Sequence, residues 1–293
     1  MPAHSQDQES SRMTLSPFPA RLSANIQAQG PLCVGIDPSA QTLRACGLPD
    51  SDEGALAFGQ RILNAGEGLL AIVKPQSAYF ERFGSAGWRS LETLIVAAHA
   101  QGVLVLLDAK RGDIDSTAEA YAHAFFAPDS PTRVDAITVH AYLGFAALGR
   151  LNDFATANGG GIFVVVRSSN PEGVPIQTAR MPDGHSVAEH LASDITNYNR
   201  AHAPHGFGSI GAVVGATCDD ASQIVEQLPL SYILAPGVGA QGATLKDVAA
   251  RFPRARDRVL PSVSRALISQ GTKLAEIRTS LRALRDTAKP LLT

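Results

Sequence analysis

The chain has 293 residues, of which 45% are hydrophobic and 18% are charged. Its 25 Lys and Arg nearly balance 27 Asp and Glu, and the formal net charge of −2 argues against a protein whose main partner is nucleic acid. The apolar fraction is too high for a disordered chain, and the length suffices for one large core. We therefore expect a compact cytoplasmic α/β enzyme.

Cysteine usage and the first residues agree with this expectation. Cys33, Cys46 and Cys218 form neither a CxxC pair nor a zinc-binding spacing, which fits a reducing compartment and predicts no metal site. Residues 1–17 are polar and lack the apolar segment of a signal peptide, so we expect a flexible tail there. No apolar stretch reaches the roughly 18 residues of a transmembrane span, and no membrane partner is expected.

From residue 32 onward, a short apolar run repeatedly ends in polar or glycine residues and leads into a helical segment. The eight runs cover residues 32–39, 69–76, 103–112, 135–144, 161–170, 210–217, 231–239 and 258–265. They begin roughly 32 residues apart on average, which suits a βα unit, and their continuous Val, Ile and Leu content indicates strands buried on both faces. The repeat predicts a (β/α)8 TIM barrel, with a doubly wound open sheet as the alternative.

The segments between the runs have helical spacing. Residues 91–102 are predicted to form a helix that ends at Gly102, and residues 116–126 a helix capped by Ser116 and Glu119. The longest interval holds an excursion over residues 170–185, on the loop after the fifth strand. Because no low-complexity linker divides the chain, we expect residues 18–293 to form a single catalytic barrel domain.

Charged side chains stand at the ends of several runs, most densely in Asp108-Ala109-Lys110-Arg111-Gly112-Asp113. Asp108 and Lys110 are two residues apart on a strand, so both side chains should point to the same face. In a barrel this is the carboxyl end of the third strand, where catalytic groups gather. A solvated, salt-bridged strand end is the simpler alternative, but inward-facing charges are costly to bury unless they are paired or used.

The segment Asp108-Ala-Lys110-Arg-Gly-Asp113-Ile114-x-x-Thr117 resembles the signature of the orotidine 5′-phosphate decarboxylase family. GIDPS at 35–39, VKPQSAYFERFG at 73–84 and APGVGAQGA at 235–243 match the longer bacterial (type 2) branch of that family, in the same order. The resemblance covers about residues 18–285. It implies a lyase that converts orotidine 5′-phosphate to uridine 5′-monophosphate and CO₂ in pyrimidine biosynthesis, without a metal or an organic cofactor.

The resemblance also implies roles for individual residues. Lys110 would protonate C6 of the pyrimidine, Asp108 would lie beside the substrate carboxylate, and Lys74 would join the charged array. The residues that would reach the active site of the other subunit, and so imply a homodimer with shared sites, are Asp113, Ile114 and Thr117. The remaining substrate-binding residues would be Asp37 at the ribose, Ser168 at the pyrimidine edge, and Pro236, Gln241 and Arg265 at the phosphate.

The chemistry of these side chains agrees with such a reaction. Loss of CO₂ from C6 leaves a carbanion with no ordinary electron sink, and a fixed ammonium at Lys110 can stabilise that charge and then donate the proton. Alternation of Lys74, Asp108, Lys110 and Asp113 of the other subunit would keep both lysines charged, because each has carboxylate neighbours.

Two other functions compete with this interpretation. A metal-assisted sugar-phosphate decarboxylase or aldolase of the same superfamily would carry an acidic metal ligand at the position of Lys74, and a non-catalytic nucleotide-binding barrel would not need the complete charged array. Residues 237–242 also fit the dinucleotide-binding pattern GxGxxG, but they follow the seventh run, where a phosphate loop is expected. Ser264 stands where many family members have glycine, and its side chain could crowd the phosphate.

Overall fold

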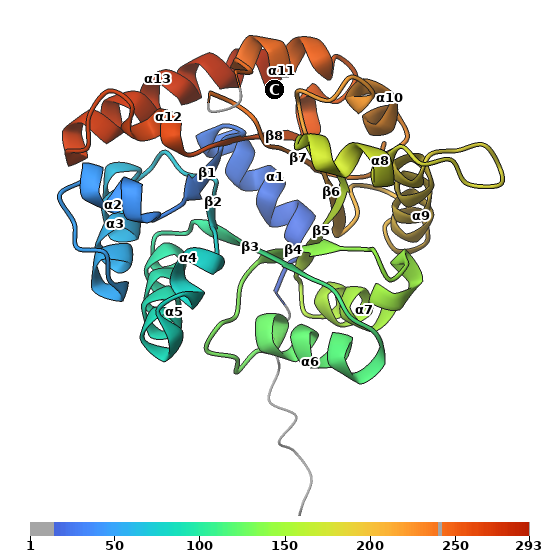
Figure 1. The fold of residues 1–293 in the computed structure, drawn as a ribbon, viewed down its shortest axis with the longest axis horizontal. Coiled ribbons are helices and arrows are strands. Elements are labelled where there is room, and N and C mark those ends of the chain that lie inside the picture. The colour runs from blue at the N-terminus through green and yellow to red at the C-terminus, as the bar shows by residue number, and fades with distance from the viewer. Residues whose placement is uncertain (1–14, 240–241, 293) are drawn as a thin grey trace, which may run out of the picture.

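The computed structural model describes residues 15–239 and 242–292. Eight parallel strands follow one another in chain order and close into a barrel, because β1 pairs with both β2 and β8 (Figure 1). The strands are β1 Cys33–Ile36, β2 Ile72–Pro75, β3 Leu104–Arg111, β4 Ala136–His140, β5 Gly161–Arg167, β6 Ile210–Val214, β7 Ile233–Ala235 and β8 Val259–Val263. The predicted TIM barrel is confirmed, and the open sheet is excluded.

Helices surround the barrel and join successive strands. The α-helices are α1 Phe18–Gln29, α2 Ala40–Ala45, α3 Asp52–Ala65, α4 Ala78–Glu81, α5 Gly84–Ala100, α6 Asp115–Phe126, α7 Gly149–Ala157, α8 Val174–Gln177, α9 Val187–His202, α10 Ala221–Glu226, α11 Leu245–Arg251, α12 Arg265–Ile268 and α13 Leu274–Leu292. The short 3₁₀ helices are η1 Phe145–Leu148, η2 Pro171–Gly173 and η3 Arg256–Arg258. Within the described residues, no helix is both long and apolar enough to cross a membrane.

Two details of the predicted helices differ in their outcome. The predicted end at Gly102 is confirmed: α5 ends at Ala100, and Gly102 follows with a φ of 71°, a conformation that glycine adopts without a steric penalty. The predicted cap at Ser116 is wrong, because α6 already begins at Asp115 and its N-cap position is Ile114. Ser116 therefore lies within the first turn.

The barrel has an outer core between strands and helices and an inner core within the barrel. Helix α1 lies across the barrel in Figure 1 and contributes Phe18, Leu22 and Ile26 to the inner core. Arg21 on the same helix forms an ion pair with Asp135, which directly precedes β4. Because the groups that hold α1 precede the strands, this helix closes the amino-terminal end of the barrel and leaves the carboxyl end open.

The predicted excursion after the fifth strand is confirmed. Between β5 and α9 the chain forms η2, α8 and a loop that projects beyond the helical ring in Figure 1. An isolated bridge joins Arg180 to Ser186, and Ser186 then caps α9 together with Glu189. Residues 168–186 therefore leave and rejoin the barrel at its carboxyl end.

Candidate active site

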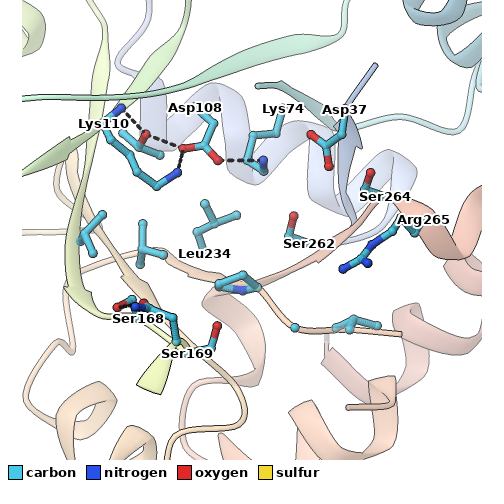
Figure 2. A pocket seen from close by; sticks show the side chains of 17 residues that line it. Asp37, Lys74, Asp108, Lys110, Ser168, Ser169, Leu234, Ser262, Ser264 and Arg265 are labelled. Carbon is cyan, nitrogen blue, oxygen red and sulfur yellow. Dashed lines mark hydrogen bonds and ion pairs between the residues drawn. The ribbon is translucent and has the colours of Figure 1, made fainter. Parts of the chain in front are cut away.

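A cavity of about 380 Å³ opens at the carboxyl end of the barrel, where α1 does not reach. Each of the eight strands, or the residues that directly follow it, contributes to its lining. Figure 2 shows Lys110, Asp108, Lys74 and Asp37 along one wall, with Ser264 and Arg265 beyond Asp37 and with Ser168 and Ser169 across the cavity. The barrel therefore assembles charged groups from strands that are far apart in the sequence.

The charged wall is a row of alternating lysine and aspartate side chains. Lys74 Nζ donates a hydrogen bond to Asp108 Oδ2 at 3.0 Å, and Lys110 Nζ donates to Asp108 Oδ1 at 2.5 Å (Figure 2). The side chains of Lys74 and Asp108 are 9% and 10% exposed, whereas that of Lys110 is 52% exposed. The carboxylate thus holds one buried lysine and one lysine that remains open to a ligand.

Burial and charge act in opposite directions on this row. Burial disfavours ionisation of Asp108, but the positive charges of Lys74 and Lys110 outweigh it and hold the pKa of the carboxyl well below its usual range. Burial likewise disfavours the charged form of Lys74, but the carboxylates of Asp108 and Asp37 raise the pKa of Lys74 above its usual range. Asp108 and Lys74 are therefore both charged at neutral pH.

Asp37 follows β1 and points into the cavity beside Lys74. Its Oδ1 atom is buried and has no hydrogen-bond partner within the described residues. Buried carboxylate oxygens without partners are rare, since each leaves the cost of its desolvation uncompensated. Asp37 therefore offers a free acceptor to a ligand that carries hydroxyl groups.

Two adjacent serines follow β5, and their hydroxyl groups differ in whether they are already hydrogen-bonded. Ser168 Oγ donates to Asn170 Oδ1 at 2.7 Å and accepts from Gln177 Nε2 at 2.8 Å, so its hydroxyl is engaged by the excursion. The backbone N–H of Ser168 also donates to Gln177 Oε1, at 3.0 Å. Ser169 lines the cavity, and its hydroxyl has no hydrogen-bond partner in the part of the chain that the structure describes.

The end of the cavity beyond Asp37 is formed by the loops after β7 and β8. Pro236 and Arg265 both line it, and Arg265 is exposed. Gly237 and Gly239 have φ values of 115° and 77°, which residues with a Cβ rarely adopt. The backbone conformation of this loop therefore requires glycine at both positions. Gln241, which the sequence also assigns to this site, lies outside the described residues.

Ser264 approaches the first strand closely. A Cβ atom built on Gly35 would lie 2.8 Å from Ser264 Cβ, which is too close for van der Waals contact. The side chain that departs from the family pattern therefore fits because residue 35 is glycine.

The structure does not bring Asp113, Ile114 and Thr117 into the cavity of their own chain. They lie on the turn after β3 and in the first residues of α6, and Ile114 and Thr117 are exposed. Asp113 Oδ1 accepts a hydrogen bond from the Ile114 backbone at 2.9 Å. These three residues therefore lie outside the cavity of their own chain.

Thr138 on β4 lines the cavity and is 1% exposed, although it was not among the site residues expected from the sequence. Its hydroxyl donates to Asp108 Oδ1 at 2.8 Å. A weak signal was present in the sequence, because Thr138 is a polar residue inside an otherwise apolar strand.

A parallel barrel with a lysine–aspartate–lysine row at its carboxyl end and a glycine-rich loop after β7 defines a TIM-barrel enzyme that acts on a small phosphorylated ligand. The sequence model of the orotidine 5′-phosphate decarboxylase / HUMPS family matches residues 30–279, and the chain belongs to this family.

Similar proteins cover nearly the whole chain. The orotidine 5′-phosphate decarboxylase of Salinispora arenicola is 44% identical over 270 residues, which are 92% of this chain and 96% of the relative. That of Myxococcus xanthus is 41% identical over 285 residues, or 94% and 99% of the two chains. A crystal structure of a related protein from Streptomyces avermitilis has a TM-score of 0.90 at 41% identity, and the match covers 98% of this chain and 99% of that one.

Proposed function

We propose that this protein is a carboxy-lyase that decarboxylates orotidine 5′-phosphate to uridine 5′-monophosphate. The observation that carries the proposal is the Lys74–Asp108–Lys110 row inside the cavity. It is supported by membership in the family and by relatives that bear the name of this activity over almost their full length. No observation favours the sugar-phosphate enzyme or the non-catalytic barrel, and the cationic Lys74 at the end of β2 opposes the former.

In the proposed reaction, the bond between C6 and the carboxylate breaks and its electron pair stays on C6 as CO₂ leaves. The Lys110 ammonium stabilises the developing carbanion and then gives it a proton, and water returns a proton to the lysine. Lys110 suits this role because its ammonium is fixed by Asp108 while half of its side chain remains accessible. Asp108 and Lys74 keep the charges in place before the substrate arrives.

The other cavity residues suit the remaining parts of the substrate. We assign the ribose hydroxyls to the free oxygen of Asp37, and the phosphate to Arg265 and the loop that begins at Pro236, with Gln241 as a further expected contact. For the pyrimidine edge we favour Ser169 over the expected Ser168, because the hydroxyl of Ser168 is already occupied.

The choice between the two serines has a direct test. Ser169→Ala should raise the KM for orotidine 5′-phosphate by about tenfold, the equivalent of one lost hydrogen bond, whereas Ser168→Ala should change KM less. A larger effect of Ser168→Ala would show that Ser168, and not Ser169, contacts the pyrimidine edge.

We also propose that two copies share their active sites. Asp113, Ile114 and Thr117 would contact the cavity of the partner, since they follow β3 and do not line the cavity of their own chain. Tyr142 and Leu143, which follow β4, are 79% and 53% exposed, and burial in a dimer would remove this apolar surface from water.

Hybrid dimers test the shared site. Each proposed site combines Lys110 of one chain with Asp113 of the other. In a dimer of one Lys110→Ala chain and one Asp113→Ala chain, one site therefore carries both substitutions and the other site carries neither. We expect such hybrids to have half of the wild-type turnover, although each parent alone is inactive. Purified hybrids without activity would contradict the shared-site arrangement.

We further propose that residues 18–293 act as one catalytic unit in the cytoplasm and need no cofactor. The three cysteines are buried and free, which suits a reducing compartment. Activity is followed by the change in ultraviolet absorbance of orotidine 5′-phosphate, with and without a chelator. Turnover that withstands the chelator supports the proposal; turnover that the chelator abolishes, or no turnover, would refute it.

A further inference from the structure

The ladder between β3 and β4 is interrupted beside the charged row. Leu107 pairs with Ile137 and Arg111 pairs with Val139, so residues 108–110 of β3 stand opposite the single Thr138 of β4. A bulge of this kind removes ladder hydrogen bonds and re-aims the side chains that it carries. Here the bulged residues include Asp108 and Lys110, which bear the charges of the site.

Thr138 supplies the hydrogen bonds that the ladder lacks at this point. The backbone N–H of Lys110 donates to Thr138 Oγ1 at 3.0 Å, and Thr138 Oγ1 donates to Asp108 Oδ1 at 2.8 Å. A hydroxyl has one proton to donate, and Asp108, as a carboxylate, can only accept. The Thr138 proton must therefore point to Asp108, and the hydroxyl oxygen accepts from the backbone of Lys110.

The backbone of Lys110 needs such support. Its φ of 46° lies in the left-handed region, which residues with a Cβ rarely adopt and which persists only where the surroundings enforce it. The hydrogen bond to Thr138 restrains the backbone N–H of Lys110, and the hydrogen bond from Nζ to Asp108 restrains the ammonium group at the end of its side chain. Both restraints meet at the same carboxylate oxygen, Asp108 Oδ1.

We propose that Thr138 is a positioning residue for the decarboxylation, because its hydroxyl locks the β3 bulge and so holds the Asp108 carboxylate and the Lys110 ammonium in one arrangement. This inference rests on the proposed function and adds a residue to its machinery. Thr138 acts through Asp108 and Lys110, so its loss should lower kcat more than it raises KM. A misplacement of catalytic groups by about 1 Å can cost about 10²-fold in rate.

Two substitutions separate the hydroxyl from the rest of the side chain. Thr138→Val keeps the shape but leaves the Lys110 N–H and one Asp108 oxygen without this partner, whereas Thr138→Ser keeps the hydroxyl and loses only a methyl group. Thr196→Val is the matched control: Thr196 is also buried, and its hydroxyl donates to the Gln227 carbonyl at 2.6 Å, outside the cavity lining. Should Thr138→Val fail to fold, Thr138→Ala carries the same expectation.

We expect Thr138→Val to lower kcat by about 10²-fold with KM changed less than about threefold, and Thr138→Ser to recover most of the loss. Thr196→Val should keep wild-type kcat even if its melting temperature falls. Undiminished kcat in Thr138→Val, or a Thr138→Ser variant as impaired as Thr138→Val, would overturn the proposal.

Amide hydrogen exchange gives a readout that does not require turnover. The chain has five lysines, so selective ¹⁵N-lysine labelling isolates the Lys110 amide among few signals. The exchange of the Lys110 amide should accelerate in Thr138→Val and remain slow in Thr138→Ser. Equal exchange rates in the two variants would refute the proposal that the Thr138 hydroxyl holds the β3 bulge. If the wild-type protein showed no turnover, the proposed function would fail, and this comparison would still decide the role of Thr138.

Discussion

Replacing Asp108 with Asn keeps the shape of the side chain and removes the negative charge between Lys74 and Lys110. Lys74 Nζ and Asp108 Oδ2 are 3.0 Å apart, and both side chains are nearly buried. At this separation and an effective dielectric constant of about 20, the lost attraction is about 5.5 kcal/mol, part of which Asp37 and the Asn amide oxygen recover. Because breaking a buried pair costs about 3–5 kcal/mol, we expect the lower end of that range, about 3 kcal/mol, or a melting temperature lower by about 6–12 °C.

The size of this effect should depend on pH in a defined way. Burial opposes the charged form of Lys74, but Asp108 outweighs it and raises the pKa of Lys74. The charged lysine therefore contributes to folding stability below its ordinary pKa of about 10.4, and this contribution is lost as the pH rises through the raised pKa. Burial also opposes ionisation of Asp108, but the two lysines outweigh it and lower the pKa of the carboxyl. The carboxylate therefore contributes to folding stability above a pH of about 3.9, and this contribution is lost as the pH falls through the lowered pKa. The difference between wild type and variant should therefore be widest between roughly pH 5 and 9.

Thermal unfolding followed by circular dichroism at acidic, neutral and alkaline pH measures this difference. Asp50→Asn serves as the control, since Asp50 pairs with Arg82 at the surface and its loss should cost less than about 1 kcal/mol. An Asp108→Asn variant as stable as wild type at pH 7, or a loss of stability independent of pH, would refute the account of the charged row.

Three further changes probe other parts of the structure. Lys110→Ala should abolish turnover while shifting the melting temperature by only a few degrees, because the side chain is half exposed; near-normal turnover would refute its role as proton donor. Arg21→Ala should destabilise the protein by about 2 kcal/mol at pH 7 and by less near pH 3, measured by thermal unfolding, because Asp135 is buried and the His99 hydrogen bond and the Arg21 charge hold its pKa below the usual range. A loss equal at both pH values would contradict this pairing. Gly35→Ala should lower stability through the clash with Ser264, and adding Ser264→Gly should restore it; purely additive losses would show that the two sites do not touch.

The barrel itself could be predicted from the sequence. Strands that are buried on both faces must be continuously apolar, and the chain returns to such a run in every βα unit, so the number and order of the strands follow from pattern and spacing alone. The positions of Lys74 and Asp108 at strand ends also follow, because parallel strands place all their carboxyl ends on one side of the barrel.

The pairing of Asp108 with Lys110 was predicted on grounds that are only partly right. Strand periodicity places residues two apart on one face, and the two side chains do meet. The strand, however, bulges at this point, and Lys110 reaches its position through a left-handed backbone conformation that Thr138 supports. Periodicity contains no information about such a bulge, because the bulge depends on the neighbouring strand.

Side chains whose partners are distant in the chain could be placed only from the folded structure. Sequence cannot distinguish Ser168 from Ser169, because the difference lies in Gln177, which folds back from the excursion to engage one of them. It also cannot show that α1 closes the amino-terminal end, since this depends on the ion pair of Arg21 with Asp135, 114 residues away. The barrel and the residues at its mouth follow from the sequence alone, because local pattern sets where each strand begins and ends. The orientation of each group required the folded chain, because hydrogen bonds between strands set it.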